Sequence, residues 1–133
     1  MIFPYESNTE GIFVRVKPSF LPDESDLARN RFVWAYNIEI ENDSEHVWKL
    51  TRRHWRIIAA NGHVQTVDGD GVVGQMPVLE PGEIFRYTSG APLNTPSGMM
   101  GGKYEFESDG QPNLMAEIPT FSLDSPYDTS RPS

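Results

Sequence analysis

The chain has 133 residues, the size of one domain, and its hydrophobic content of 38% is enough to build a buried core. A formal net charge of −8 disfavours binding to duplex nucleic acid or to an anionic membrane surface. The absence of cysteine excludes disulfides, thiolate nucleophiles and cysteine-based zinc sites. The N-terminus has no signal-peptide pattern, and no apolar run approaches the ~20 residues of a membrane span, so we expect a cytoplasmic protein.

The first half of the chain alternates apolar and polar residues, which is typical of strands with one buried face. A first strand is predicted over residues 12–17, and Pro18 is expected to end it because proline cannot donate to a sheet ladder. The acidic segment 21–26 is expected to form a loop that includes at most a short helical turn. A second strand is predicted over 32–40, followed by a turn at 42–45.

The same pattern continues to the end of the predicted domain. A third strand is predicted over 47–60, and Asn61-Gly62 predicts a type I′ hairpin turn that returns the chain over 63–67. Further strands are predicted over 84–87, 103–107 and 114–118. No helical period is sustained anywhere. The fold predicted is therefore all-β, an immunoglobulin- or fibronectin-III-like β-sandwich of about seven or more antiparallel strands.

The third strand contains a conflict of side-chain parity. Leu50 and Trp55 lie at positions of opposite parity, so a regular strand cannot bury both. A β-bulge within 51–54 would resolve the conflict by resetting the register. It would also present Arg52, Arg53 and His54 in an unusual direction.

A glycine run at 68–74 spells G-x-G-x-x-G in Gly69, Gly71 and Gly74. A dinucleotide-binding loop needs a helix directly after it, whereas Pro77 prevents a regular helix here, and no Walker lysine follows Gly74. Two interpretations stay open. The run is a structural loop whose glycines supply positive φ, with Val72 and Val73 closing the end of the sandwich, or its N–H groups form a nest that binds an anion.

A basic cluster precedes this run and comprises Lys49, Arg52, Arg53, His54 and Arg56. If the hairpin brings the cluster near the glycine run, then Gly69, Gly71, Gly74, Arg53 and Arg52 would form a binding site for a nucleotide or pyrophosphate. The alternative is that these arginines pair with Asp and Glu side chains on neighbouring strands.

The sequence shows no pattern of metal ligands or of catalytic residues. The three histidines, His46, His54 and His63, lack the close spacing of metal ligands, so no metal site is predicted. Hydroxyls such as Ser89 have no recognisable base beside them, so no catalytic residue and no cofactor are predicted, and we expect a protein that is not an enzyme.

Many ordered positions resemble the ApaG family of small bacterial proteins, whose domain is also appended to larger eukaryotic proteins. The matching positions are Leu50, Arg53-His54-Trp55, Ile57, Asn61-Gly62, Gly69 to Gly74, Gln75-Met76-Pro77, Leu79, Pro81-Gly82-Glu83, Tyr87 to Gly90, Pro96, Gly98, Met100, Gly102, Tyr104, Ile118-Pro119, Phe121 and Leu123. A serine often precedes the Arg-His-Trp triplet in that family, whereas Arg52 stands here.

The resemblance implies a fibronectin-III-like sandwich that is often a homodimer, in a family associated with cobalt tolerance and magnesium efflux. It also implies a protein-interaction module, with a partner whose identity the sequence does not give. We therefore expect one domain over 1–123, followed by a disordered tail over 124–133, which lies outside the family pattern.

Overall fold

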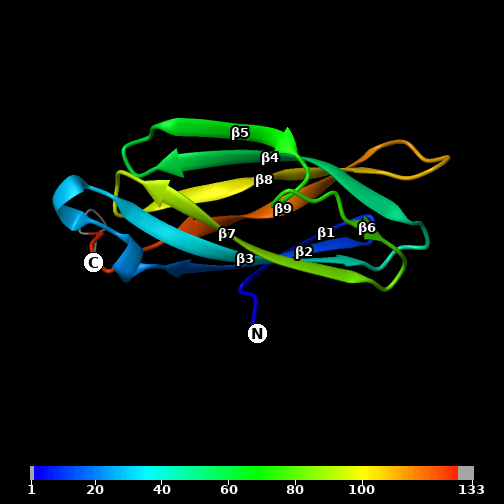
Figure 1. Cartoon of the computed structure of the whole chain (residues 1–133), viewed down its shortest axis with the longest axis horizontal. Helices are drawn as coiled ribbons and strands as arrows, with labels where there is room; N and C mark the ends of the chain where they lie inside the picture. Colours follow the sequence, from blue (N-terminus) through cyan, green and yellow to red (C-terminus); the bar gives the residue numbers. More distant parts are fainter. Residues whose placement is uncertain (1, 129–133) are drawn as a thin grey trace.

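Two antiparallel sheets pack face to face in the structure, a computed structural model that describes residues 2–128 (Figure 1). The first sheet contains, in spatial order, β1 (Tyr5–Thr9), β2 (Ile12–Phe20), β3 (Phe32–Asn42) and β7 (Ile84–Leu93). The second contains β5 (Val64–Asp70), β4 (Trp48–Ala59), β8 (Gly98–Glu107) and β9 (Leu114–Leu123), and β6 (Val78–Leu79) also pairs with β4. Two short 3-10 helices, η1 (Pro22–Glu24) and η2 (Leu27–Arg29), connect β2 to β3. The prediction of an all-β sandwich is confirmed.

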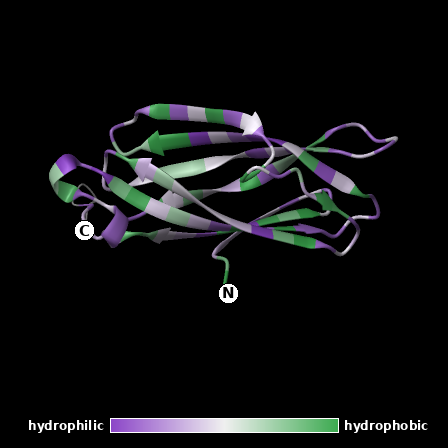
Figure 2. Cartoon of the chain, in the orientation of Figure 1, coloured by the Kyte–Doolittle hydropathy of each residue, from purple (hydrophilic) through white to green (hydrophobic). Residues whose placement is uncertain are grey.

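The core lies between the sheets and is formed by the inward-facing residues of both. Hydrophobic and hydrophilic residues alternate along several strands, as the colouring of Figure 2 shows. Trp55 of β4 stands at the centre of an aromatic cluster, with its ring centroid 5.3 Å from that of Tyr36 and 6.1 Å from that of Phe121. No helix in residues 2–128 has the length and apolarity needed to cross a membrane.

The two long edges of the sandwich differ. At one edge, β1 packs against β9, where the hydroxyl of Ser7 donates to the carbonyl of Glu117 and the hydroxyl of Thr9 accepts from its N–H. At the other edge, β5 pairs only with β4 and β7 pairs only with β3 within the described residues. The sandwich is therefore closed along one edge and open between β5 and β7.

The predicted β-bulge is present in β4. The register between β4 and β8 shifts between Leu50 and Arg52, so that Thr51 is the additional residue. Leu50 and Trp55 are consequently both buried, as the sequence required. After the bulge, Arg53 shares the inward-facing parity of Trp55, which decides where its guanidinium lies.

Three expectations from the sequence need correction. Pro18 does not end the first strand, because β2 continues to Phe20; β1 pairs with β2 only as far as Val16, so one side of β2 is unpaired at Pro18. The strand β1 was not predicted at all. The turn before β5 is not type I′, since Gly62 alone has positive φ there and its N–H donates to the carbonyl of Ala59.

The start of the predicted tail contacts the sandwich. The indole N–H of Trp34 donates to the carbonyl of Asp124 over 2.7 Å, and the ring of Tyr127 lies edge-on to that of Phe20. The remainder of the predicted disordered segment, residues 129–133, lies outside the described residues.

A row of alternating charges crosses the outer face of the first sheet. Glu6, Arg15, Glu39 and Arg86 occupy successive register positions on its strands, and Glu39 accepts from both arginines at 2.8 Å. Burial tends to raise the pKa of Glu39, but the two guanidinium groups outweigh it and the pKa is lowered. Glu39 is therefore ionised at neutral pH. Together with Glu6, Arg15 and Arg86 it forms a chain of ion pairs across all four strands of the sheet.

We expect Glu39→Gln to lower the free energy of unfolding by about 1–3 kcal/mol at pH 7, between the values typical of exposed and of buried ion pairs. Because the pKa of Glu39 is lowered in the folded state, its contribution is present above the pKa of the unfolded chain and is lost as pH falls through the folded value. Urea denaturation at pH 7 and at acidic pH measures both effects. If the difference in unfolding free energy between wild type and Glu39→Gln did not shrink at acidic pH, the ionised Glu39 could not be the source of the stabilisation.

Candidate functional site

Each glycine of the G-x-G-x-x-G run has its own structural reason. Gly69 lies in β5 opposite Arg53, and a β-carbon there would be 2.9 Å from three atoms of the guanidinium. At Gly71 a β-carbon would meet the carbonyl oxygen of Gln75 at 2.1 Å. Gly74 has φ +77 and follows Val73, with φ 44, so these two residues form the centre of a type I′ turn.

The hydrogen bonds of this run are largely internal. The N–H of Gly71 donates to the carbonyl of Thr51, and Val72 and Gln75 exchange both backbone hydrogen bonds across the turn. Val72 is buried, as expected, whereas half of the Val73 surface is exposed. A nest would need N–H groups that face outward, and at these positions they already have carbonyl partners.

The structure brings the two predicted arginines to the run but not into a common anion site. Arg52 forms an ion pair of 2.8 Å with the carboxylate of Asp70. Nη1 of Arg53 donates to the carbonyls of Asp70 and Gly71, at 2.9 and 3.0 Å. The predicted anion site formed by Gly69, Gly71, Gly74, Arg53 and Arg52 stays a prediction, and an anion there would have to displace one of these contacts.

The three histidines are on different parts of the sandwich. His54 lies on the outer face of the second sheet, where Nδ1 is 2.5 Å from Oδ1 of Asp68. Its Nε2 is buried and has no hydrogen-bond partner among residues 2–128. His46 precedes β4 and His63 precedes β5, and no group of three or more His, Asp or Glu side chains that could hold a metal occurs in the described part of the chain.

The inward-facing Arg53 borders a cavity at the open edge of the sandwich. A cavity of about 250 Å³ lies between β5 and β7, with Arg53, Tyr36, Gln65 and Ser89 among its polar walls. Its apolar walls are Trp55, Ile57, Val67, Ala91, Pro92 and Met100. We call this cavity the edge cleft; a small number of polar groups on an apolar wall is the usual make-up of a ligand site.

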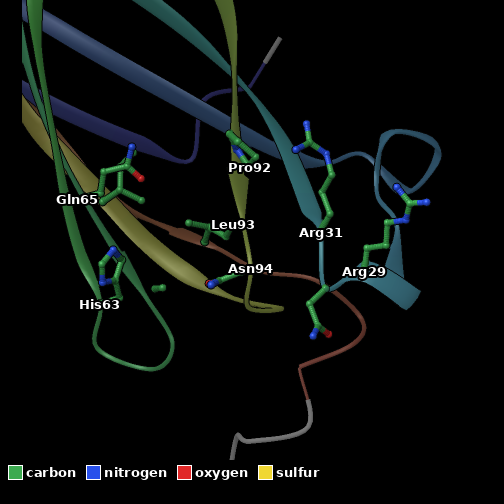
Figure 3. A pocket seen from close by; sticks show the side chains of 10 residues that line it. Arg29, Arg31, His63, Gln65, Pro92, Leu93 and Asn94 are labelled. Carbon is green, nitrogen blue, oxygen red and sulfur yellow. The ribbon is translucent and has the colours of Figure 1, made fainter.

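A second cavity, of about 460 Å³, continues from the edge cleft toward η2, and Ile57, Gln65 and Pro92 line both. Figure 3 shows this outer cavity with His63 and Gln65 on one wall and Arg29 and Arg31 on the other. No Asp or Glu lines either cavity, although the chain has 19 acidic residues against 11 Lys and Arg. In the described part of the chain, the walls of these two cavities therefore carry arginines but no carboxylate, in a protein that is acidic overall.

Three tyrosine hydroxyls lie near the guanidinium of Arg53. Tyr36 is in the wall of the edge cleft, and the hydroxyls of Tyr87 and Tyr104 form a short hydrogen bond with each other. Burial raises the pKa of Tyr36, and contact with the Ser89 hydroxyl and the charge of Arg53 oppose this only in part. Burial also raises the pKa values of Tyr87 and Tyr104. All three phenols are therefore neutral at physiological pH and able to donate hydrogen bonds.

The sequence interpretation identified Arg53 but not the surface that it faces. The glycine run can be found in the sequence because its residues are contiguous. The edge cleft cannot, because its residues come from separate strands, including β3, β4, β5 and β7. One signal was available: the predicted bulge places Arg53 on the same side as Trp55, and therefore among core aromatics rather than in solvent.

Comparison with known proteins agrees with this architecture. The fold and the open edge define a fibronectin-III-like β-sandwich with a cleft at one side. The model of the ApaG domain matches residues 22–108. The chain is 51% identical to Protein ApaG of Maricaulis maris strain MCS10 over 124 residues, covering 93% of this chain and 95% of that protein. It is 50% identical to Protein ApaG of Methylorubrum extorquens strain PA1 over 123 residues, with 92% and 95% covered.

A solved structure has the same fold. The crystal structure of the ApaA protein from Bordetella pertussis superimposes with a TM-score of 0.83 at 40% identity, over 87% of this chain and 94% of that one. The chain therefore belongs to the ApaG family, and the resemblance inferred from its motifs is confirmed.

Proposed function

We propose that this chain is a non-enzymatic binding module that engages a partner protein along the open edge between β5 and β7. The observation that carries the proposal is the pair of edge strands, each of which has no pairing partner among residues 2–128 on the side that borders the cleft. Unpaired strand edges are templates for an added strand, and a partner segment that pairs there gains main-chain hydrogen bonds. The cavities between the strands would receive its side chains.

The charge of this edge supports an acidic segment as the partner. Arg29, Arg31, Arg53 and His63 line the two cavities, and Arg31 and Arg53 have no carboxylate within 4.0 Å among residues 2–128. Opposite charge accelerates association and orients the docking surfaces. The proposal that the protein is not an enzyme rests on a further observation: its one His–carboxylate pair in the described residues has the second ring nitrogen buried.

Site-specific photocrosslinking tests this proposal. A benzophenone side chain would replace Thr66 of β5 or Thr88 of β7, with Met115 of β9, on the opposite edge, as the control position. We expect one adduct of defined mass from Thr66 and Thr88 and none from Met115. The partner, once identified and purified, should bind more weakly to Thr88→Glu than to Met115→Glu. Equal adducts at all three positions, or equal binding by both variants, would contradict the proposal.

The same experiment addresses self-association. An adduct with twice the mass of the chain would identify the partner as a second copy, in line with the homodimer that the family resemblance implies. The family's association with cobalt tolerance and magnesium efflux would then be indirect, acting through the partner rather than through a metal bound by this chain. A thermal denaturation midpoint that rises in Co²⁺ or Mg²⁺ would contradict that indirect role.

The nucleotide or pyrophosphate alternative is supported by one observation: both arginines contact the glycine run, Arg52 through the carboxylate of Asp70 and Arg53 through the carbonyls of Asp70 and Gly71. Calorimetric titration with pyrophosphate tests it, with Arg52→Gln as the informative variant. Binding that is salt-sensitive and lost in Arg52→Gln would support a site at the run. Because the N–H groups of Gly71, Val72 and Gln75 already have partners, we expect no binding heat.

A further inference from the structure

We propose that the edge cleft binds a carboxylate group carried on a small apolar body, with the guanidinium of Arg53 as its anchor. The inference goes beyond the proposed function, because the ligand it names is a small organic acid rather than a protein. It rests on the hydrogen-bonding state of Arg53, the chemistry of the cleft walls and the volume of the cavity.

The first step concerns the donors of Arg53. A guanidinium has five N–H donors, and Nη1 uses its own on the carbonyls of Asp70 and Gly71. Nε and Nη2 donate to no residue in the range 2–128, and neither is a buried atom without a partner. These donors are thus not fully buried, and Arg53 is one of the residues that line the cleft. Their fork geometry suits the two oxygens of a carboxylate.

The second step concerns how Arg53 is held. It lies on β4 between Gly69 of β5 and Tyr104 of β8, its register partners on either side. The absence of a side chain at Gly69 makes room for the guanidinium, because a β-carbon there would be 2.9 Å from its central carbon. The two hydrogen bonds from Nη1 hold the side chain in this space before a ligand arrives, which lowers the entropic cost of binding.

The third step concerns the type of anion. Among residues 2–128, Arg53 is the one cationic residue in the wall of the edge cleft, and no acidic residue there opposes it. A monovalent carboxylate would neutralise this charge, whereas a phosphate dianion would add a second charge against Trp55, Val67 and Met100. The neutral hydroxyls of Tyr36 and Ser89 supply further donors in the same wall. Apolar walls then favour an aromatic or aliphatic body behind the carboxylate.

The last step concerns size. The edge cleft measures about 250 Å³, slightly below the ~300 Å³ at which drug-sized pockets begin. A free acid of the size of benzoate or hexanoate therefore fits the cavity itself. The same carboxylate chemistry could be presented by a glutamate of a partner segment, which would also occupy the adjoining cavity lined by Arg29, Arg31 and His63.

NMR titration of the ¹⁵N-labelled protein tests the inference, with benzoate as the free acid and acetylated, amidated hexaglutamate as the peptide source. The Nε–H resonance of Arg53 is expected to shift in the presence of benzoate. Arg53→Gln should weaken binding at least about tenfold, and Arg53→Lys, which keeps the charge but loses the fork, should weaken it less. Tyr36→Phe removes only a hydroxyl and should also weaken binding, which guards against misfolding in Arg53→Gln.

Arg56→Gln is the matched control. Arg56 lies on the same strand but is exposed on the outer face, so this variant changes the net charge equally without touching the edge cleft. Binding of benzoate within about twofold of the wild type in this control supports a specific site. If Arg56→Gln weakens benzoate as much as Arg53→Gln does, or if the Arg53 resonance does not respond to either probe, the inference is overturned.

The two probes separate this inference from the proposed function. Benzoate binding without hexaglutamate binding supports a free-acid site, whatever the photocrosslinking experiment shows. Hexaglutamate binding that depends on Arg53, without benzoate binding, overturns the small-acid ligand and assigns the carboxylate to a partner segment. A failed crosslink at Thr66 and Thr88 bears on the proposed function alone.

Discussion

Gly102→Ala is expected to lower the free energy of unfolding by about 3–5 kcal/mol, the range of severe core disruptions. The reason is the closeness of two strands in the middle of the second sheet. A β-carbon at Gly102 of β8 would lie 1.9 Å from the carbonyl oxygen of His54 and 3.1 Å from the α-carbon of Trp55. Both neighbours are backbone atoms of β4, so no side chain can turn aside to relieve the clash.

The matched control for this prediction is Gly90→Ala. Gly90 also has an extended backbone, but it lies on the edge strand β7, and its nearest contact for a β-carbon is the carbonyl of Trp34 at an ordinary 3.4 Å. Thermal denaturation should give a midpoint lower by about 10–20 °C for Gly102→Ala and nearly unchanged for Gly90→Ala. Equal midpoints for the two variants would show that β8 can move away from β4 at little cost.

This close approach matters for the edge cleft as well as for stability. His54 and Trp55 directly follow Arg53 on β4, so a displacement of β4 from β8 would also move the guanidinium. The bulge at Thr51 lies on the same strand and turns Arg53 inward. The N–H of Gly71 stabilises the bulge by donating to the carbonyl of Thr51 over 2.8 Å. The bulge, Gly69 and Gly102 together determine where Arg53 lies.

The strands that alternate clearly could be predicted from the sequence because their inward residues are apolar. Trp34, Tyr36 and Ile38 of β3 are buried as expected. The strand β1 lacks this signal, since Glu6, Ser7, Asn8 and Thr9 are polar, and contacts with Glu117, more than a hundred residues away, hold its position. Such long-range hydrogen bonds leave no local pattern in the sequence.

The candidate site could be predicted only in part for a related reason. Arg53 was predicted as a binding residue from its neighbours in the sequence, which stays a prediction, whereas the bulge beside it is confirmed. Tyr36 and Ser89 reach the same cleft from β3 and β7, as register partners of each other. Which strands border the open edge is a matter of topology, and a single sequence does not encode it as a motif.

The glycine run shows how a short motif changes meaning with its context. In a strand–helix unit these three glycines would approach a pyrophosphate. Here Gly69 leaves room for a side chain, Gly71 approaches the carbonyl of Gln75 closely, and Gly74 lies in a turn with positive φ. Gly69 makes room for the guanidinium of Arg53, because a β-carbon there would be 2.9 Å from it.

Asn42→Asp is expected to lower the free energy of unfolding by about 3–4 kcal/mol at pH 7, because it introduces a carboxyl into a fully buried site. The Nδ2 group of Asn42 donates to the carbonyls of His46 and Leu79, at 2.7 and 2.8 Å. Its Oδ1 accepts from both the N–H and the hydroxyl of Ser44. In Asn42→Asp the carboxyl can still accept from Ser44, but its other oxygen replaces the Nδ2 group and faces the carbonyl oxygens of His46 and Leu79.

The pH dependence of this variant has a definite sign. Burial and the facing carbonyls would raise the pKa of the new carboxyl in the folded state, so the folded protein binds more protons than the unfolded chain. The destabilisation should therefore be smallest near pH 4 and grow as pH rises toward 7. Asn37→Asp, on the outer side of the same strand, keeps its acceptor contact with Thr88 and should cost less than about 0.5 kcal/mol. Urea denaturation across this pH range measures both variants. If Asn42→Asp lost no stability between pH 4 and 7, water would have to reach the carboxyl. Asn42 could then not be a buried link between β3 and β6.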